Sequence, residues 1–246
     1  MRRSVLVVLP AVALVLGLGV GDAAAQSVSL DLGEGGTVTG QLVRLVLLIT
    51  VLSLAPSILV MVTSFTRVVV VLAFLRSALG LQQTPPNAVL ISLALFVTAF
   101  IMAPTLEQAY REGLAPLLEE DMDELDAFER AMAPFRTFML AQVRAKDLEL
   151  FLNIGAMPAL EAPQDTPLRA LIPAFMISEL RRAFEIGFLI FVPFLVIDMV
   201  IASILMSMGM MMLPPVLISL PFKLIFFVLV DGWYLVVGSL VESFAP

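Results

Sequence analysis

Residues 186–206 read IGFLIFVPFLVIDMVIASILM, and Asp198 is the single charged residue among them. An apolar stretch of about 20 residues is long enough to cross the hydrocarbon core of a bilayer as a helix. Residues 213–241 form a second such stretch, and residues 41–62 and 87–104 are also apolar. The pattern predicts an all-α integral membrane protein with four apolar segments arranged as long helical hairpins.

The overall composition points the same way. The chain has 246 residues, of which 60% are hydrophobic and 14% charged, and its mean hydropathy is +1.04. Ordinary soluble domains carry about 25% charged residues. A soluble domain of this length cannot bury so much apolar surface, which leaves a membrane or other apolar subunits as its surroundings.

Cysteine and histidine are both absent from the sequence. Their absence removes thiolate nucleophiles, zinc sites with Cys or His ligands and the side chain best suited to proton transfer near neutral pH. We therefore predict no catalytic residues, no metal and no cofactor. The net charge of −7 and the lack of a basic face argue against a nucleic-acid partner.

The N-terminus resembles a secretory signal peptide. Arg2 and Arg3 precede an apolar stretch, and three alanines end at Ala25, so cleavage is predicted between Ala25 and Gln26. The alternative is a first transmembrane helix that stays attached. We predict a signal peptide over residues 1–25 and a polar linker over 26–40.

Three further regions follow the linker: apolar helices 1 and 2 over residues 41–106, a helical domain over 107–185, and apolar helices 3 and 4 over 186–246. The middle region holds 15 acidic and 8 basic residues and has a soluble composition. A helix is predicted within it over residues 133–152.

Lysine and arginine bias in short loops indicates which side of a membrane a loop faces. The connection over residues 63–87 carries Arg67 and Arg76 but no acidic residue, so we expect it on the cytoplasmic side. These two arginines are nine residues apart, which places them on opposite faces of a helix. The acidic region over 107–185 is then expected outside the cytoplasm.

Several blocks resemble the signatures of the FliP family of flagellar and type III secretion export-gate proteins. The longest is PAFMISELRRAFEIGF over residues 173–188, and PFLVIDMV over 193–200 follows it. The resemblance covers roughly residues 41–241 in order, and its shorter blocks are TSFTR at 63–67, LPP at 213–215, FKL at 222–224 and DGW at 231–233.

This resemblance implies a pore-forming core subunit of the flagellar export gate, with a cleaved signal and one extracytoplasmic domain. Several copies are expected to assemble with FliQ-like and FliR-like subunits into a helical ring. That ring would sit in the basal body of the inner membrane, largely raised above the membrane plane, beside other export-apparatus proteins. Unfolded exported proteins would be its substrate.

The methionine-rich segment between the last two apolar stretches is the candidate pore seal. Methionine is flexible and polarisable, so a ring of such side chains can close around an irregular surface. Glycine allows a sharp backbone turn there. The alternative is ordinary packing between helices. The residues are Met208, Gly209, Met210, Met211 and Met212.

Three charges lie inside apolar stretches: Asp198, Lys223 and Asp231. A charge at the centre of a membrane helix costs roughly 2.5–3.5 kcal/mol, so each is expected to have a partner. Asp198 with Lys223 is the expected pair. The alternative function is a secondary transporter or an ion or proton channel that uses these three residues.

A last group of residues is predicted to contact neighbouring subunits. Glu179, Arg182 and Glu185 are spaced three apart, so each acid can neighbour the arginine on a helix face, either as a solvated cap or as a subunit contact. Phe138 and Phe151 either pack in a core or anchor a neighbouring copy, with Arg144 as a polar companion.

Overall fold

The computed structural model describes residues 38–119, 121–157, 162–210 and 213–244, and every regular element among them is a helix. The all-α fold class is therefore confirmed for these residues. The signal peptide and its cleavage site at Ala25 and Gln26 lie outside them, as do Met211 and Met212. The chain divides into two compact units, residues 1–52 and 53–246.

The described part of the first unit is the beginning of helix α2, which runs from Val38 to Val62. Val46 and Ile49 are exposed on it, and the Thr50 hydroxyl donates to the Val46 carbonyl oxygen at 2.7 Å, one turn earlier. Donation of this kind keeps a small polar side chain satisfied along an apolar helix.

The second unit continues from α2 into ten further helical elements. In chain order they are α3 (Phe65–Ala78), α4 (Asn87–Ala109), the π-helix η1 (Tyr110–Leu114), α5 (Ala115–Leu118), α6 (Glu124–Gln142), α7 (Ala145–Ile154), the 3₁₀ turn η2 (Pro163–Asp165), α8 (Leu168–Ser207), α9 (Pro215–Leu229) and α10 (Gly232–Glu242).

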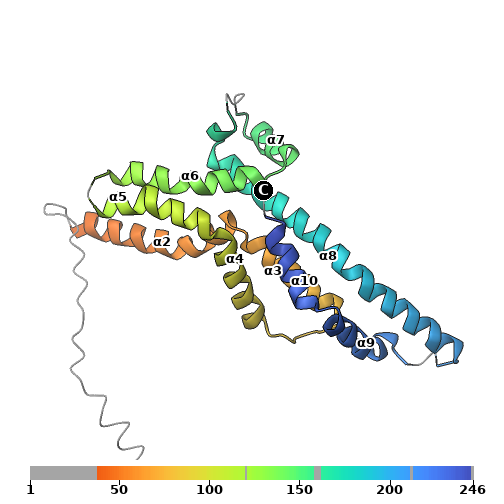
Figure 1. The fold of residues 1–246 in the computed structure, drawn as a ribbon. Helices are drawn as coiled ribbons and strands as arrows, with labels where there is room; N and C mark the ends of the chain where they lie inside the picture. The colour runs from red at the N-terminus through yellow and green to blue at the C-terminus, as the bar shows by residue number, and fades with distance from the viewer. Residues whose placement is uncertain (1–37, 120, 158–161, 211–212, 245–246) are drawn as a thin grey trace, which may run out of the picture. The chain divides into compact units, whose positions relative to one another are not determined.

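Helix α8 is 40 residues long and runs without a break past the expected boundary between residues 185 and 186 (Figure 1). The acidic region and the third apolar stretch therefore share one helix. Pro173 and Pro193 lie inside it. Prolines are tolerated within long apolar helices where neighbouring groups satisfy the carbonyl that loses its hydrogen bond.

Helices α3 and α8 pack closely because a glycine lies at their contact. A Cβ atom on Gly187 would stand 2.6 Å from the Phe74 ring, which leaves no room for a larger residue. Val68, Val71 and Leu72 of α3 continue this core toward α4 and α10, where they meet buried apolar side chains. Such interdigitation leaves α3 almost wholly enclosed within the second unit.

The described residues contain two helical stretches long and apolar enough to cross a membrane, Asn87–Leu118 and Leu168–Ser207. Helices α9 and α10 make a third candidate if they count as one span, although they bend by 63° at Asp231. Four apolar segments were predicted, and the described residues support two of them as continuous helical stretches and a third as a bent pair.

The helix predicted over residues 133–152 is wrong, because the chain breaks into α6 and α7. Val143 and Arg144 are extended between them. The Arg144 backbone N–H donates to the Ser178 hydroxyl at 3.1 Å, and the same hydroxyl donates to Asp147 at 2.7 Å. These contacts with α8 outweigh the local helical preference of the sequence.

Candidate functional site

The predicted pore segment begins as the turn that ends α8. Gly209 has φ of +74°, and the Gly209 and Met210 N–H groups donate to the carbonyls of Met206 and Leu205 at 3.1 and 3.0 Å. This pair of bonds is the Schellman arrangement, in which a glycine just past the helix adopts the left-handed conformation. Met208 is 63% exposed and Met210 37%. The turn therefore presents these methionines on the surface of the chain.

Asp198 and Lys223 lie together where α8 meets α9. The Lys223 ammonium is 2.6 Å from Asp198 Oδ2, and it also donates to the Ala78 carbonyl at the end of α3 at 3.3 Å. The Ser219 hydroxyl donates to the other carboxylate oxygen. Lys223 is buried, so its charge is balanced inside the chain by the expected partner.

Asp231 is not part of this pair and is located at the bend between α9 and α10. Its φ of +51° is left-handed, which is uncommon for a residue with a side chain, and it is exposed. Among the described residues it forms no ion pair. The sequence placed Asp231 inside an apolar helix, whereas the structure places it at a break.

The guanidinium of Arg67 on α3 is one of two charged groups in the described residues with no exposed surface; the other is the Glu179 carboxylate. The guanidinium donates to both carboxylate oxygens of Glu179, at 2.8 and 2.5 Å, and to Gln142 Oε1 at 3.0 Å. It also donates at 3.0 Å to the carbonyl and to the hydroxyl of Ser243, and its carbon lies 3.6 Å from the centre of the Phe244 ring. All five N–H donors of an arginine are thereby used.

This cluster joins four parts of the second unit: α3, the end of α6, α8 and the segment just after α10. Arg67 and Glu179 are both 0% exposed. A buried charge is tolerated when it is both paired and hydrogen-bonded, and Arg67 meets both conditions. We call Arg67, Glu179, Gln142 and Ser243 the buried arginine cluster.

The side chain of Glu179, one of the residues expected to contact a neighbouring subunit, is fully enclosed within its own chain. Its partner is Arg67, and neither Arg182 nor Glu185 takes the predicted i,i+3 pairing. Arg182 donates to Gln142 Oε1 at 3.2 Å, and Glu185 accepts from Arg181 at 2.8 Å, one turn earlier. Helical spacing allowed the predicted pairs, but tertiary partners were nearer.

The two aromatic residues expected in the middle region differ in their contacts. Phe138 stacks on Phe244 with ring centres 6.0 Å apart and meets Phe175 edge to face at 5.9 Å, so it packs within the chain. Phe151 on α7 is half-buried. Arg144, its expected companion, lies 3.8 Å from Asp147.

Sequence reasoning missed Gln142 and Ser243 altogether, and it treated Arg67 as a marker of membrane orientation and as part of the TSFTR block, without a partner. A neutral amide near the end of a helix and a serine near the C-terminus carry no local signal of a role. The signal that was present is an arginine in an otherwise apolar stretch, which requires a partner.

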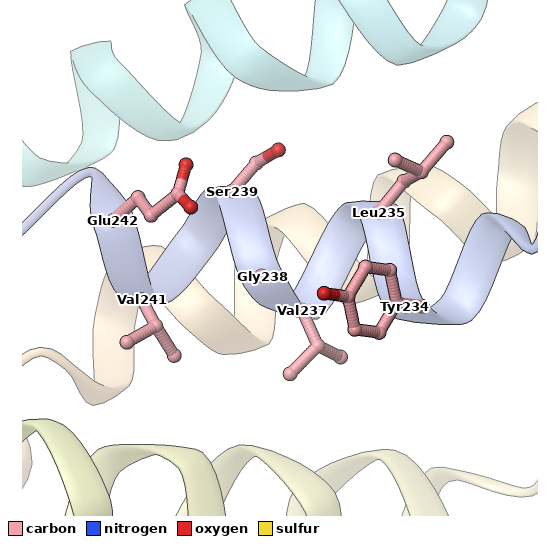
Figure 2. Close-up of a pocket in the computed structure, with 7 residues that line it drawn as sticks. All are labelled: Tyr234, Leu235, Val237, Gly238, Ser239, Val241 and Glu242. Carbon is pink, nitrogen blue, oxygen red and sulfur yellow. The ribbon is translucent and has the colours of Figure 1, made fainter.

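The described residues contain no group of three acidic residues that could hold a metal ion. One surface hollow of about 400 Å³ is lined by seven residues that all come from α10 (Figure 2). Its two titratable residues, Tyr234 and Glu242, are eight residues apart, or about 12 Å along the helix, too far to act jointly on one small molecule.

Comparison with known proteins identifies relatives along most of the chain. A sequence model of the FliP family matches residues 48–240. A flagellar biosynthetic protein FliP from Caulobacter vibrioides is 59% identical over 243 residues, which cover 99% of this chain and 91% of the relative. Proteins of the same name from Rhizobium meliloti and Bacillus subtilis are 55% and 57% identical, over 91% and 82% of this chain and 94% and 91% of their own lengths.

Proposed function

The chain belongs to the FliP family, and we propose that it is a pore-forming core subunit of the flagellar type III protein export gate. In this role it passes unfolded flagellar proteins across the inner membrane at the flagellar basal body. Copies of the chain assemble with FliQ-like and FliR-like subunits, and the region over residues 107–185 lies outside the cytoplasm.

The observation that carries this proposal is the unpartnered apolar surface of α8. Phe188 and Leu189 are 69% and 67% exposed, and Phe184, Val196 and Met199 are more than half exposed as well. An apolar surface of this extent needs lipid or another subunit against it. Exposed apolar residues along α8, the helix that leads to the methionine turn, are what we expect of a chain that assembles with other subunits.

The methionine turn is the proposed seal. Its position between α8 and α9, with Met208 and Met210 exposed, supports a ring of methionines contributed by several copies. Flexible thioether side chains adapt to an irregular passing polypeptide and close again behind it. Gly209 allows the turn without backbone strain.

The alternative of a transporter or ion channel depends on free charges within the apolar helices. Lys223 is occupied by Asp198 and a backbone carbonyl, and Asp198 also accepts from Ser219. These contacts suit a structural pair that fastens α9 to α8 and α3. We infer a structural role for the pair and no enzymatic activity for the chain.

Replacement of Met210, Met211 and Met212 together by alanine tests the seal. We expect cells that carry this variant to lose their membrane potential, because the truncated side chains no longer fill the opening. The membrane potential is measured with a potential-sensitive dye in cells that carry the variant and lack the native protein. The matched control replaces Met206, an exposed methionine of α8 just before the turn, and should retain the potential.

An unchanged membrane potential in the triple variant, with normal amounts of assembled complex, would refute the seal. The wider proposal has its own test, because purification with the FliQ-like and FliR-like subunits should recover a particle holding several copies of this chain. Recovery of the chain only as a monomer would overturn the proposal that it forms a pore.

A further inference from the structure

Helix α8 carries an open apolar groove along its middle part. The groove measures about 620 Å³ and is lined by Phe74 of α3 and by apolar residues of α8. Four of these α8 residues form a row, which we call the groove row: Phe184, Phe188, Phe191 and Leu195. Phe184 and Phe188 are 57% and 69% exposed, so the groove lies on the outside of the chain.

The groove row has the spacing of a seam between two helices. Its members follow one another at intervals of four, three and four residues. Apolar residues at such intervals lie on one face of a helix, and that face packs against a second helix with a matching row. The groove is therefore suited to an apolar helix with the same spacing.

Helix α9 has a row of this kind on its outer face. We call it the α9 row, and its members are Ile218, Phe222, Ile225 and Leu229. They are also four, three and four residues apart, and all of them are exposed. Another face of α9 is turned into its own chain, where Ser219, Lys223 and Phe227 are buried. The α9 row is thus free to contact a second copy.

Charges beside the two rows favour one direction of packing. Arg181 is exposed just before the groove row, and Asp231 is exposed just after the α9 row and forms no ion pair with any described residue. Antiparallel packing brings Asp231 to Arg181, whereas parallel packing brings it to the level of Asp198, a second carboxylate. Fourteen residues separate Arg181 from Leu195 and thirteen separate Ile218 from Asp231, about 21 and 20 Å along a helix.

We propose that α9 of one copy of this chain lies antiparallel in the α8 groove of the next copy, with Asp231 beside Arg181. Arg181 already contacts Glu185 at 2.8 Å, but both side chains are exposed, and a surface pair holds its arginine only weakly. The contact is head-to-tail, because the groove and the α9 row are different surfaces, so further copies add in the same way. This inference rests on the proposed assembly of several copies and assigns the surfaces that meet.

Two rival occupants of the groove are a lipid acyl chain and a helix of a partner subunit. An acyl chain would fill the apolar space but would gain nothing from Arg181. A helix of another subunit would need both the matching row and an acidic residue at its end. The α9 row is a described segment that has both features.

The absence of cysteine from the chain makes disulfide cross-linking specific. One full-length form would carry Phe184→Cys and one epitope tag, and a second would carry Leu229→Cys and another tag. Both are produced together with the FliQ-like and FliR-like subunits, and the purified particle is oxidised. A disulfide needs Cβ atoms about 3.5–4.5 Å apart, so we expect a product that carries both tags.

Two further pairs test the direction and the face of packing. Phe184→Cys with Ile218→Cys would cross-link only in parallel packing. Phe184→Cys with Val228→Cys is the matched control, because Val228 is 75% exposed and adjoins the α9 row without belonging to it. Neither pair should give a doubly tagged product.

The charge contact has its own variants. Asp231→Asn removes the charge and keeps a residue that tolerates the left-handed backbone at this position. It should slow formation of the 184–229 product by up to about fivefold, the effect of an exposed ion pair. Arg181→Gln should do the same, and the two together should slow it no further. The control Arg111→Gln, from another exposed pair, should leave the rate unchanged.

Three results would overturn the proposal. The first is a particle that holds several copies but gives no 184–229 product, which would assign the groove to another occupant and leave the export role intact. The second is a product from the 184–218 pair, which would mean parallel packing. The third is an equal effect of Arg111→Gln, or additive effects of Asp231→Asn and Arg181→Gln. Recovery of monomers alone would remove the proposed assembly together with this inference.

Discussion

Removal of Arg67 from the buried arginine cluster is the sharpest test of how this fold is held together. The variant Arg67→Ala deletes a guanidinium whose donors reach Glu179, Gln142 and Ser243. Glu179 is then left as an unpaired carboxylate with no exposed surface. Removing one partner of a buried ion pair lowers the free energy of unfolding far more than removing a surface contact does.

The expected magnitude follows from that geometry. Breaking a buried ion pair by removing one partner costs about 3–5 kcal/mol. For a chain of this size, a change of about 1 kcal/mol moves Tm by roughly 2–4 °C. Arg67→Ala should therefore lower Tm by about 6–20 °C. The double variant Arg67→Met with Glu179→Leu removes both charges and should recover most of this loss, because an apolar replacement of a buried pair is often neutral or stabilising.

Thermal unfolding of the detergent-solubilised chain, followed by far-ultraviolet circular dichroism, measures these shifts. The matched control is Arg111→Ala, which removes an arginine of the same kind from an exposed i,i+4 pair with Glu107. Surface pairs contribute about 0–1 kcal/mol, so its Tm should change by less than about 4 °C. The reasoning is refuted if Arg67→Ala lowers Tm no more than this control does, or if the double variant is as unstable as the single one.

Two further variants probe the ends of α8 and its contact with α9. Asp198→Lys places a second cation beside the buried Lys223, so we expect much less complex to be recovered with the partner subunits. The exchanged pair, Asp198→Lys with Lys223→Asp, should restore part of the yield. Full recovery of the complex with the single variant would contradict the pairing. Gly209→Ala meets no steric obstacle but must adopt a left-handed φ, at a cost of about 1 kcal/mol or a Tm lower by about 2–4 °C. An unchanged Tm would mean that the turn is free to change its conformation.

The helical class followed from composition and from the length of the apolar stretches. Residues 186–206 required a long helix, because a run of apolar residues with one charge has few other stable forms, and α8 is that helix. Its start at Leu168 was not predicted, because Pro173 and the charged residues after it resembled a boundary. Tertiary contacts with α3 and α6 carry the helix through that region.

The candidate site, like the fold, was predicted only in part from the sequence. Asp198 and Lys223 were recognisable because each is a charge in apolar surroundings, and two opposite charges in neighbouring apolar stretches are expected to meet. The pairs predicted for Glu179, Arg182 and Glu185 were wrong because helical spacing limits only which residues on one helix can touch. It contains no information about an arginine on α3, more than one hundred residues earlier in the chain.

Local chemistry by itself therefore determined the class of this protein, its need for apolar surroundings and the glycine turn among the methionines, while the resemblance of its sequence blocks to known proteins indicated its family. The tertiary structure decided which charge is buried with which, where α6 ends and which face of α8 stays exposed. The physical reason is that propensity and hydrophobic length act over a few residues along the chain, whereas the partner of a buried charge is chosen by elements that meet only after the chain has folded.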